Sequence, residues 1–163
     1  VLGEASANWL GIDTGRAAPL GPQSLPIEYA VLVYATLGKQ PRTRLTPPEV
    51  LAKCPWLESA MAKAPHCWDD QHAVLELVRV DLGGPADHVA RKCVADLHER
   101  YRLREFSRLV AQHHFRLVVI TATREKAAAV RQALERHDLF PGLPVHLPVV
   151  PQLLSLTGSI HHA

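Results

Sequence analysis

Long apolar runs and a strong excess of charge of one sign are both absent from the 163-residue sequence. No stretch of about 18 apolar residues occurs, so the sequence predicts no membrane-spanning helix and no membrane partner. The first residues do not combine a basic segment with an apolar core, so we expect no signal peptide. The formal net charge of +2 is too small to identify a nucleic-acid-binding protein by itself. These absences predict a cytoplasmic globular protein, and an apolar fraction of 47% is enough to pack one domain.

Cysteine is scarce, and the common catalytic and metal-binding motifs are missing. Cys54, Cys67 and Cys93 form no CxxC pair, which favours reduced, buried thiols over disulfides or a cysteine-bound zinc. The ten His residues show no HExxH or Cys/His spacing that would indicate a zinc site. The sequence also has no P-loop, no GxSxG and no GxGxxG between a strand and a helix. Nucleotide hydrolysis and serine-hydrolase chemistry therefore have no support, and we expect no resident cofactor.

The hydrophobic pattern predicts an α/β domain. We expect residues 1–25 to form a short helix and a loop, and residues 26–163 to form a single domain. The pattern predicts helices at 27–38, 47–54, 56–64, 85–113 and 123–137, and strands at 73–80, 116–122 and 143–150. Helical crossovers of this length permit the strands to pair in parallel. The sequence therefore predicts a central sheet flanked by helices.

Acidic residues flank the predicted strand at residues 73–80 and suggest a nuclease-type site. Phosphodiester hydrolysis commonly needs carboxylates that hold Mg²⁺ and a Lys near the attacking water. Asp70, next to Asp69, precedes this strand, Asp81 ends it, and Lys92 follows on the next helix. Asp70, Asp81 and Lys92 are the candidate catalytic residues, and Asp70 and Asp81 are the candidate ligands for Mg²⁺. Asp also commonly occupies turns and strand ends, which is the structural alternative.

The strand itself carries no intact nuclease motif. Restriction-endonuclease-like folds use an Asp and then Glu/Asp-x-Lys on a central strand. Here the residues at 76–78, Glu-Leu-Val, have Val in place of Lys, and those at 79–81, Arg-Val-Asp, have Arg in place of the first carboxylate. Lys92 on the following helix could substitute, because only its position in space matters. Since a strand alternates sides, we expect Glu76 and Arg79 on opposite faces.

Basic residues gather on the predicted helix at residues 85–113. They could follow a phosphate backbone, and the candidate DNA-binding residues are Arg91, Lys92, Arg100, Arg102, Arg104 and Arg108. Asp96, Glu99 and Glu105 dilute this charge, so a solvated amphipathic helix is the structural alternative.

From residue 25 to residue 139, the order of segments resembles the replication-relaxation family, whose members are encoded on plasmids and integrative conjugative elements. The matching pieces are Asp70, the strand end VRVDLGG with Asp81, the helix ARKCVADLHERY with Lys92 and Tyr101, the strand RLVVITA and the helix REKAAAVRQAL. In that family a winged-helix domain precedes a degenerate restriction-endonuclease-like domain. The resemblance implies a restriction-endonuclease-like core here, with a central mixed sheet flanked by helices, in a C-terminal fragment of a longer protein. Arg79 departs from the acidic residue expected two places before Asp81, which weakens the expectation of catalysis.

Together these observations predict a DNA-associated accessory or regulatory domain of a bacterial mobile element, acting in replication or transfer without robust catalysis. The expected partners are DNA, a second copy of the chain, or other mobile-element proteins. One alternative is a Mg²⁺-dependent nuclease that uses Asp70, Asp81 and Lys92. The other is a protein-interaction or dimerisation module that presents the apolar tail at residues 143–156.

Overall fold

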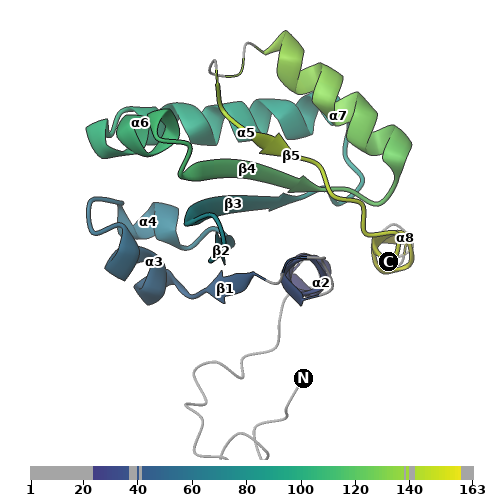
Figure 1. The fold of residues 1–163 in the computed structure, drawn as a ribbon. Coiled ribbons are helices and arrows are strands. Elements are labelled where there is room, and N and C mark those ends of the chain that lie inside the picture. The colour runs from purple at the N-terminus through teal and green to yellow at the C-terminus, as the bar shows by residue number, and fades with distance from the viewer. Residues whose placement is uncertain (1–23, 37–39, 41, 138, 140–141, 159–163) are drawn as a thin grey trace, which may run out of the picture.

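A computed structural model describes residues 24–36, 40, 42–137, 139 and 142–158 of the chain (Figure 1). The helix predicted at the amino terminus and most of the loop expected up to residue 25 lie outside these residues. Residues 24 and 25 belong to the first described helix, which begins slightly earlier than the sequence predicts.

A five-stranded mixed sheet lies at the centre of the domain, in the order β1-β2-β3-β4-β5. The strands are β1 (Thr43–Leu45), β2 (His66–Asp69), β3 (Val74–Val80), β4 (Phe115–Ile120) and β5 (Val145–His146). β1, β2 and β3 pair in antiparallel fashion, whereas β3, β4 and β5 are parallel. The structure confirms the predicted α/β class and the central mixed sheet flanked by helices.

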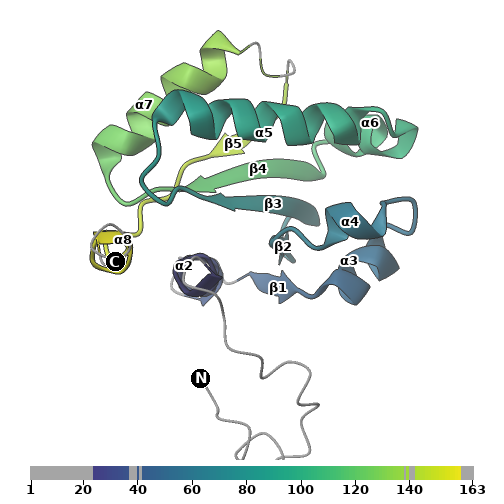
Figure 2. The same ribbon diagram turned by 180° about the vertical axis from the view of Figure 1, so that it is seen from behind.

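Helices cover both faces of the sheet. They are α2 (Ser24–Thr36), α3 (Pro47–Lys53), α4 (Ser59–Ala62), α5 (Ala86–Tyr101), α6 (Arg104–Ala111), α7 (Arg124–Arg136) and α8 (Leu153–Gly158). Figures 1 and 2 show α5, α6 and α7 along one face, and α2 and α8 along the other. Among the described residues, no helix combines the length and the apolar character needed to cross a membrane.

Two helix starts follow from side chains that satisfy free backbone groups. At α3, the Glu49 carboxylate accepts hydrogen bonds from the backbone N–H (2.6 Å) and the hydroxyl (2.7 Å) of Thr46. At α7, the Thr123 hydroxyl oxygen accepts a bond of 3.1 Å from the backbone N–H of Lys126. Both starts are predicted by the sequence, and the structure confirms them.

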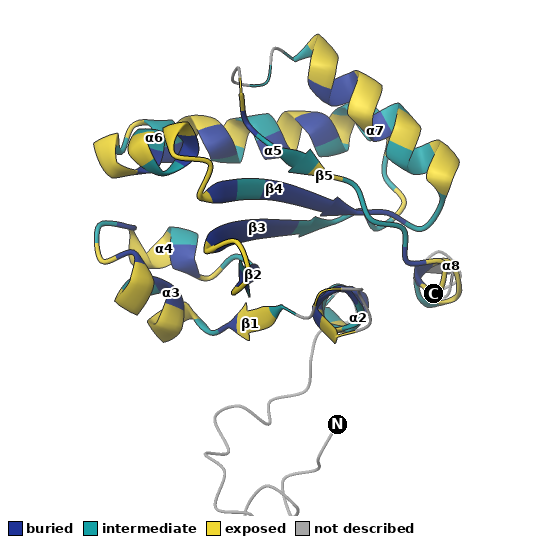
Figure 3. Cartoon of the chain, viewed as in Figure 1, coloured by how far each residue is buried: buried dark blue, intermediate teal, exposed yellow. Residues whose placement is uncertain are grey.

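The sheet separates two apolar cores (Figure 3). The core beneath α5 contains Leu75 and Leu77 of β3, together with buried residues of α3, α5, α6, α7 and β4. The core beneath α2 contains Val78 of β3, with Val118 and Ile120 of β4 and residues of α2 and α8. Adjacent residues of β3 therefore enter different cores, which is the alternation expected of a central strand.

Several elements differ from the sequence-based predictions. The short strands β1 and β2 are not predicted by the sequence. The third predicted strand, residues 143–150, contains only two strand residues and an isolated bridge from Thr121 to Val149. By contrast, the segment 85–113, which the sequence predicts as helix in one or two pieces, forms the two helices α5 and α6, because Leu103 adopts an extended conformation.

Candidate functional site

Glu76 and Arg79 lie on opposite faces of β3, as its alternation predicts. In the register of the sheet, Glu76 is flanked by Cys67 of β2 and Arg116 of β4. Its side chain enters the α2 face, while that of Arg79 enters the α5 face, where Asp96 of α5 is its partner. Each face therefore contains a charged group within its core, and a buried charge needs partners of the opposite sign.

On the α2 face, both oxygens of the fully buried Glu76 carboxylate have partners. The Arg116 Nη1 donates to Oε1 at 2.8 Å, and the Tyr34 hydroxyl donates to Oε2 at 2.9 Å. The Arg42 Nε lies 2.9 Å from Oε2 as an ion pair that lacks hydrogen-bond alignment, and its guanidinium stacks on the Tyr34 ring. Burial and the Glu76 charge raise the pKa of the Tyr34 hydroxyl, so this group stays a donor at neutral pH.

Asp69, at the end of β2, belongs to the same cluster. Its Oδ1 accepts bonds from the backbone N–H groups of Gln71 and His72, and its Oδ2 lies 2.9 Å from the His72 Nδ1. Burial opposes ionisation, but the hydrogen bonds from His72 hold the pKa of Asp69 below its usual value. The Arg116 Nη1 is 3.7 Å from Asp69 and 2.8 Å from Glu76, so this guanidinium lies between the two carboxylates.

The predicted catalytic residues are not brought together. Asp70 is exposed just before β3, where its Oδ2 accepts a bond of 3.1 Å from the Thr43 hydroxyl. Asp81 follows the opposite end of β3, so the length of the seven-residue strand, roughly 23 Å, separates the two carboxylates. One Mg²⁺ ion cannot contact both. Among the described residues, no group of His, Cys, Asp and Glu side chains is arranged to hold a metal ion.

Asp81 instead shapes the turn between β3 and α5. Its Oδ1 accepts a bond of 3.0 Å from the backbone N–H of Gly83, whose φ of +99° favours glycine. Its Oδ2 lies 3.6 Å from the Lys126 Nζ, which also donates to the carbonyl of Gly84. This arrangement matches the structural alternative for Asp81, a turn residue at a strand end.

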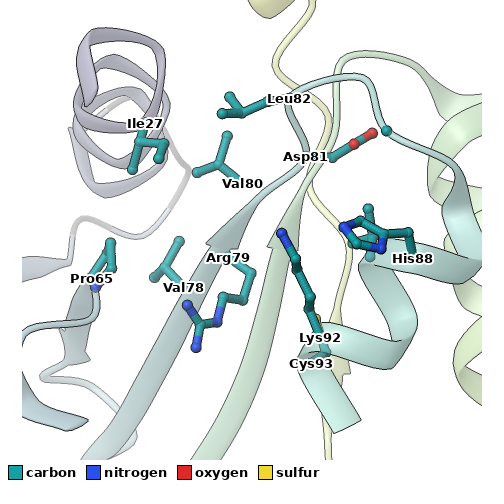
Figure 4. A pocket seen from close by; sticks show the side chains of 12 residues that line it. Ile27, Pro65, Val78, Arg79, Val80, Asp81, Leu82, His88, Lys92 and Cys93 are labelled. Carbon is teal, nitrogen blue, oxygen red and sulfur yellow. The ribbon is translucent and has the colours of Figure 1, made fainter. Parts of the chain in front are cut away.

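Beyond this turn, an open cleft of about 560 Å³ borders the carboxyl end of β3 (Figure 4). The cleft exists because β2 pairs with β3 only as far as Leu77. The last residues of β3 therefore pair with β4 on one side and have no neighbouring strand on the other side, between α2 and α5. One wall is apolar, and the other carries positive or titratable side chains. The apolar wall includes Ile27, Pro65, Val78 and Val80, and the polar wall includes Arg79, His88 and Lys92.

Arg79 is connected to a charged network beneath α5. Its Nη2 lies 2.6 Å from Asp96 Oδ2, and the Arg100 Nε lies 3.5 Å from the same oxygen. The Arg100 Nη2 donates to the carbonyl of Met61 at 3.1 Å. Nearby, the buried His66 donates from Nδ1 to the Ala64 carbonyl at 2.7 Å, while its Nε2 has no partner among the described residues. Burial, with the Arg100 charge adding to it, lowers the pKa of His66 to about 4.

The candidate DNA-binding residues do not form one surface. Arg100 is 1% exposed and cannot reach a nucleic acid, so its inclusion in the set is corrected by the structure. Arg91 and Arg102 are exposed but paired with Asp87 and Glu99 on their own helix. The other three residues are exposed and show no acidic partner in the described part of the chain: Lys92, Arg104 and Arg108.

The three cysteines are buried free thiols, as the sequence predicts. Burial raises the pKa of Cys67 to about 12 and that of Cys93 to about 11, and it also raises the pKa of Cys54. These thiols are therefore protonated at neutral pH, which favours a packing role over a nucleophilic one.

Sequence reasoning missed the partners of Glu76, namely Tyr34, Arg42 and Arg116. A signal was present, because a carboxylate inside a strand of apolar residues requires buried donors or cations. Arg116 begins the next long strand, and parallel pairing places it beside Glu76. Arg42 and Tyr34 come from segments whose positions depend on the three-dimensional fold.

Comparison of the chain with protein-family models, with curated proteins and with solved structures found no match. A functional proposal therefore depends on the geometry described above and on the resemblance of the segment order.

Proposed function

We propose that the chain is a DNA-associated accessory domain of a bacterial mobile element, built on a restriction-endonuclease-like core and lacking robust nuclease activity. The observation that carries DNA association is the exposure of five basic side chains on α5, α6 and the link between them: Arg91, Lys92, Arg102, Arg104 and Arg108. The mobile-element context rests on the resemblance of the segment order to the replication-relaxation family.

The free cations favour contact with phosphates over structural pairing. Lys92, Arg104 and Arg108 have no acidic partner among the described residues, so a bound phosphate would not have to displace one. Each phosphate neutralised by such a side chain releases counterions and makes affinity depend on salt. The same side chains offer no base-reading element, because the exposed surface lies on the outer side of a helix layer (Figure 3). We therefore expect weak sequence preference.

The state of the buried carboxylates supports an absence of catalysis. Glu76 is the central-strand carboxylate expected in a nuclease-type motif, and both its oxygens are engaged by Arg116, Arg42 and Tyr34. A divalent cation at Asp69 and Glu76 would have to displace the Arg116 guanidinium that lies between them. The ion would have to break the existing ion pairs of two buried carboxylates, which is unfavourable.

The test is a fluorescence-anisotropy titration of a labelled duplex and a labelled single strand at about 50 mM and about 200 mM salt. We expect binding that weakens with salt, and at least about tenfold weaker binding by the Arg104→Glu/Arg108→Glu variant. The matched control is Lys53→Glu/Lys63→Glu, which makes the same change in net charge on α3 and after α4.

Equal losses in the two variants would show a general charge effect and contradict a DNA surface on α6. Absent or salt-independent binding would contradict DNA association altogether. The same samples with Mg²⁺ should leave the DNA intact on a denaturing gel, and cleavage that disappears in Asp81→Ala would favour the nuclease alternative.

A protein-interaction role has one supporting observation. Leu25 and Leu32 of α2 and Leu154 of α8 are exposed, and these two helices are in contact. Within the tail expected to present an apolar surface, Leu143, Val150 and Leu153 are buried, while the remaining residues up to 156 are partly or fully exposed. Sedimentation velocity tests this alternative: a dimer that Leu32→Lys/Leu154→Lys converts to a monomer would support it, and a monomeric parent chain would contradict it.

A further inference from the structure

We infer that the cleft beside the carboxyl end of β3 binds a phosphomonoester whose organic part carries an apolar or aromatic group. A nucleoside 5′-monophosphate, with its aromatic base, is the representative ligand. This inference concerns a cleft that shares Lys92 with the surface proposed to contact DNA but contains neither Arg104 nor Arg108 of α6. It rests on the two contrasting walls of the cleft, on their charges and on the size of the space between them (Figure 4).

The polar wall supplies cations that are only partly neutralised. The Arg79 Nη2 forms an ion pair with Asp96, while the Arg79 Nε is buried without a hydrogen-bond partner among the described residues. Arg79, Lys92 and His88 all line the cleft, and Figure 4 shows the Lys92 amine reaching toward the end of β3, whereas the Arg79 guanidinium extends from β3 in another direction. The Lys92 amine has no ion pair within the described ranges. Two cationic residues from neighbouring elements thus line one cleft.

The one carboxylate that lines the cleft does not cancel this charge. Asp81 is held by the Gly83 N–H and lies 3.6 Å from the Lys126 Nζ, so its charge is already balanced from the α7 side. The cleft therefore keeps a positive excess from Arg79 and Lys92. A phosphomonoester carries between one and two negative charges at neutral pH, which fits this excess better than a single carboxylate does. The first turn of α5 borders the cleft and adds positive potential.

The opposite wall suits a flat apolar group. Ile27 of α2 faces Val78 and Val80 of β3, and Pro65 closes the side at the start of β2. Ligand sites in proteins commonly have volumes of roughly 300–1,000 Å³ and combine apolar walls with a few polar groups, and this cleft of about 560 Å³ falls in that range. Its position outside the carboxyl end of a parallel strand is also where α/β sheets bind ligands. Because the apolar wall has no groups that read base edges, we expect little preference among bases.

The test uses the whole chain and isothermal titration with adenosine 5′-monophosphate, adenosine and inorganic phosphate. We expect the monophosphate to bind at least about tenfold more tightly than adenosine or phosphate alone, since both walls are then occupied. Lys92→Ala should weaken monophosphate binding by about tenfold or more through loss of a charge-assisted hydrogen bond. His88→Trp, which places bulk at the mouth of the cleft, should weaken both adenosine and monophosphate binding.

The matched control is Arg131→Ala, which removes one exposed positive charge on α7 at a residue that does not line the cleft. It should leave monophosphate affinity unchanged.

A second experiment compares a 5′-phosphorylated oligonucleotide with the same oligonucleotide carrying a 5′-hydroxyl group. Tighter binding of the phosphorylated strand that depends on Lys92 would identify a nucleic-acid end as the source of the phosphate. Equal binding of the two oligonucleotides, with binding of the monophosphate retained, would identify a free nucleotide.

Two results would overturn the inference: no phosphate-dependent binding of either probe, or binding that Lys92→Ala does not weaken. These results can be separated from failure of the proposed function. The variant Arg104→Glu/Arg108→Glu tests DNA association and leaves every cleft residue in place, so each proposal can fail while the other stands.

Discussion

On the α2 face of the sheet, two carboxylates pair with two guanidinium groups. On the α5 face, a single carboxylate pairs with two guanidinium groups. Glu76 and Asp69 are matched by Arg42 and Arg116, and the charges balance. Beneath α5, Asp96 is the shared partner of Arg79 and Arg100, so one positive charge remains in excess. On the balanced face both oxygens of Glu76 are engaged, while the excess on the other face lies next to an open cleft. Buried charge in this domain thus has a structural role on one face and is available to a ligand on the other.

The largest effect is expected from breaking the balanced face. Glu76→Ala leaves Arg42 and Arg116 without their shared carboxylate, and an uncompensated buried charge costs about 3–5 kcal/mol. Urea denaturation should therefore show a free energy of unfolding lower by this amount, or a chain that does not fold. The control, Glu135→Ala on the exposed side of α7, should stay within about 0.5 kcal/mol of the parent. A loss below about 1 kcal/mol in Glu76→Ala would contradict the structural role assigned to this cluster.

A smaller loss is expected on the α5 face. Arg100→Ala removes the guanidinium that pairs with Asp96 and bonds the Met61 carbonyl, but Asp96 keeps Arg79 as a partner and is partly exposed. We expect destabilisation of about 3 kcal/mol, because a buried group and its hydrogen bond are lost. Arg104→Ala, four residues along and exposed, should change stability by less than about 0.5 kcal/mol. Equal losses in the two variants would show that Arg100 is not buried in solution.

Buried histidines should also make the stability of the domain depend on pH. His66 on the α5 face has a folded pKa of about 4 against an ordinary value of 6.5, because burial disfavours the imidazolium. Between these values the unfolded chain binds more protons than the folded chain, so stability falls as pH decreases from 6.5 to 4, by up to roughly 3 kcal/mol. Burial lowers the pKa of His146 as well, which adds a change of the same sign. On the α2 face, the pKa of Asp69 is lowered from its ordinary value of 3.8. The stability that this carboxylate contributes is therefore fully present above pH 3.8 and is lost as the pH falls below that value.

Urea titrations at several pH values between 4.5 and 7 measure this slope. The variant His66→Gln keeps a donor for the Ala64 carbonyl and removes the titrating ring, so its stability should depend less on pH. A parent chain of constant stability over the interval, or an unchanged slope in His66→Gln, would argue against a neutral buried imidazole.

The sequence was informative where local rules decide the structure. Thr46 and Thr123 mark the starts of α3 and α7. At α3 the Glu49 carboxylate accepts a hydrogen bond from the Thr46 backbone N–H, and at α7 the Thr123 hydroxyl accepts one from the Lys126 backbone N–H. The alternation along β3 places Glu76 and Arg79 correctly, since the period of a strand is independent of its partners. The central sheet and its flanking helices follow from these elements.

The candidate site was less predictable, because it depends on contacts between distant segments. Arg100 was assigned to a DNA surface, although it continues the buried row of Ala90, Cys93 and Leu97 on α5. Sequence patterns assign a charged residue to the surface by default. The buried position of Arg100 becomes clear only from its partners, Asp96 and the Met61 carbonyl. Asp70 and Asp81 flank the predicted strand, and the structure shows that the extended length of β3 keeps the two carboxylates too far apart to share one metal ion.

The smallest effect is expected from Mg²⁺, which tests whether the balanced face is closed to metal. Binding to the native state stabilises a protein according to the ratio of ligand concentration to its dissociation constant. Since Arg116 lies between Asp69 and Glu76, we expect about 10 mM Mg²⁺ to raise the free energy of unfolding by less than about 0.5 kcal/mol relative to NaCl of equal ionic strength. A larger rise that Asp69→Asn removes would show that a divalent ion displaces the guanidinium. The Glu76 cluster would then be a metal site, and the contrast between a closed face and an open one would no longer hold.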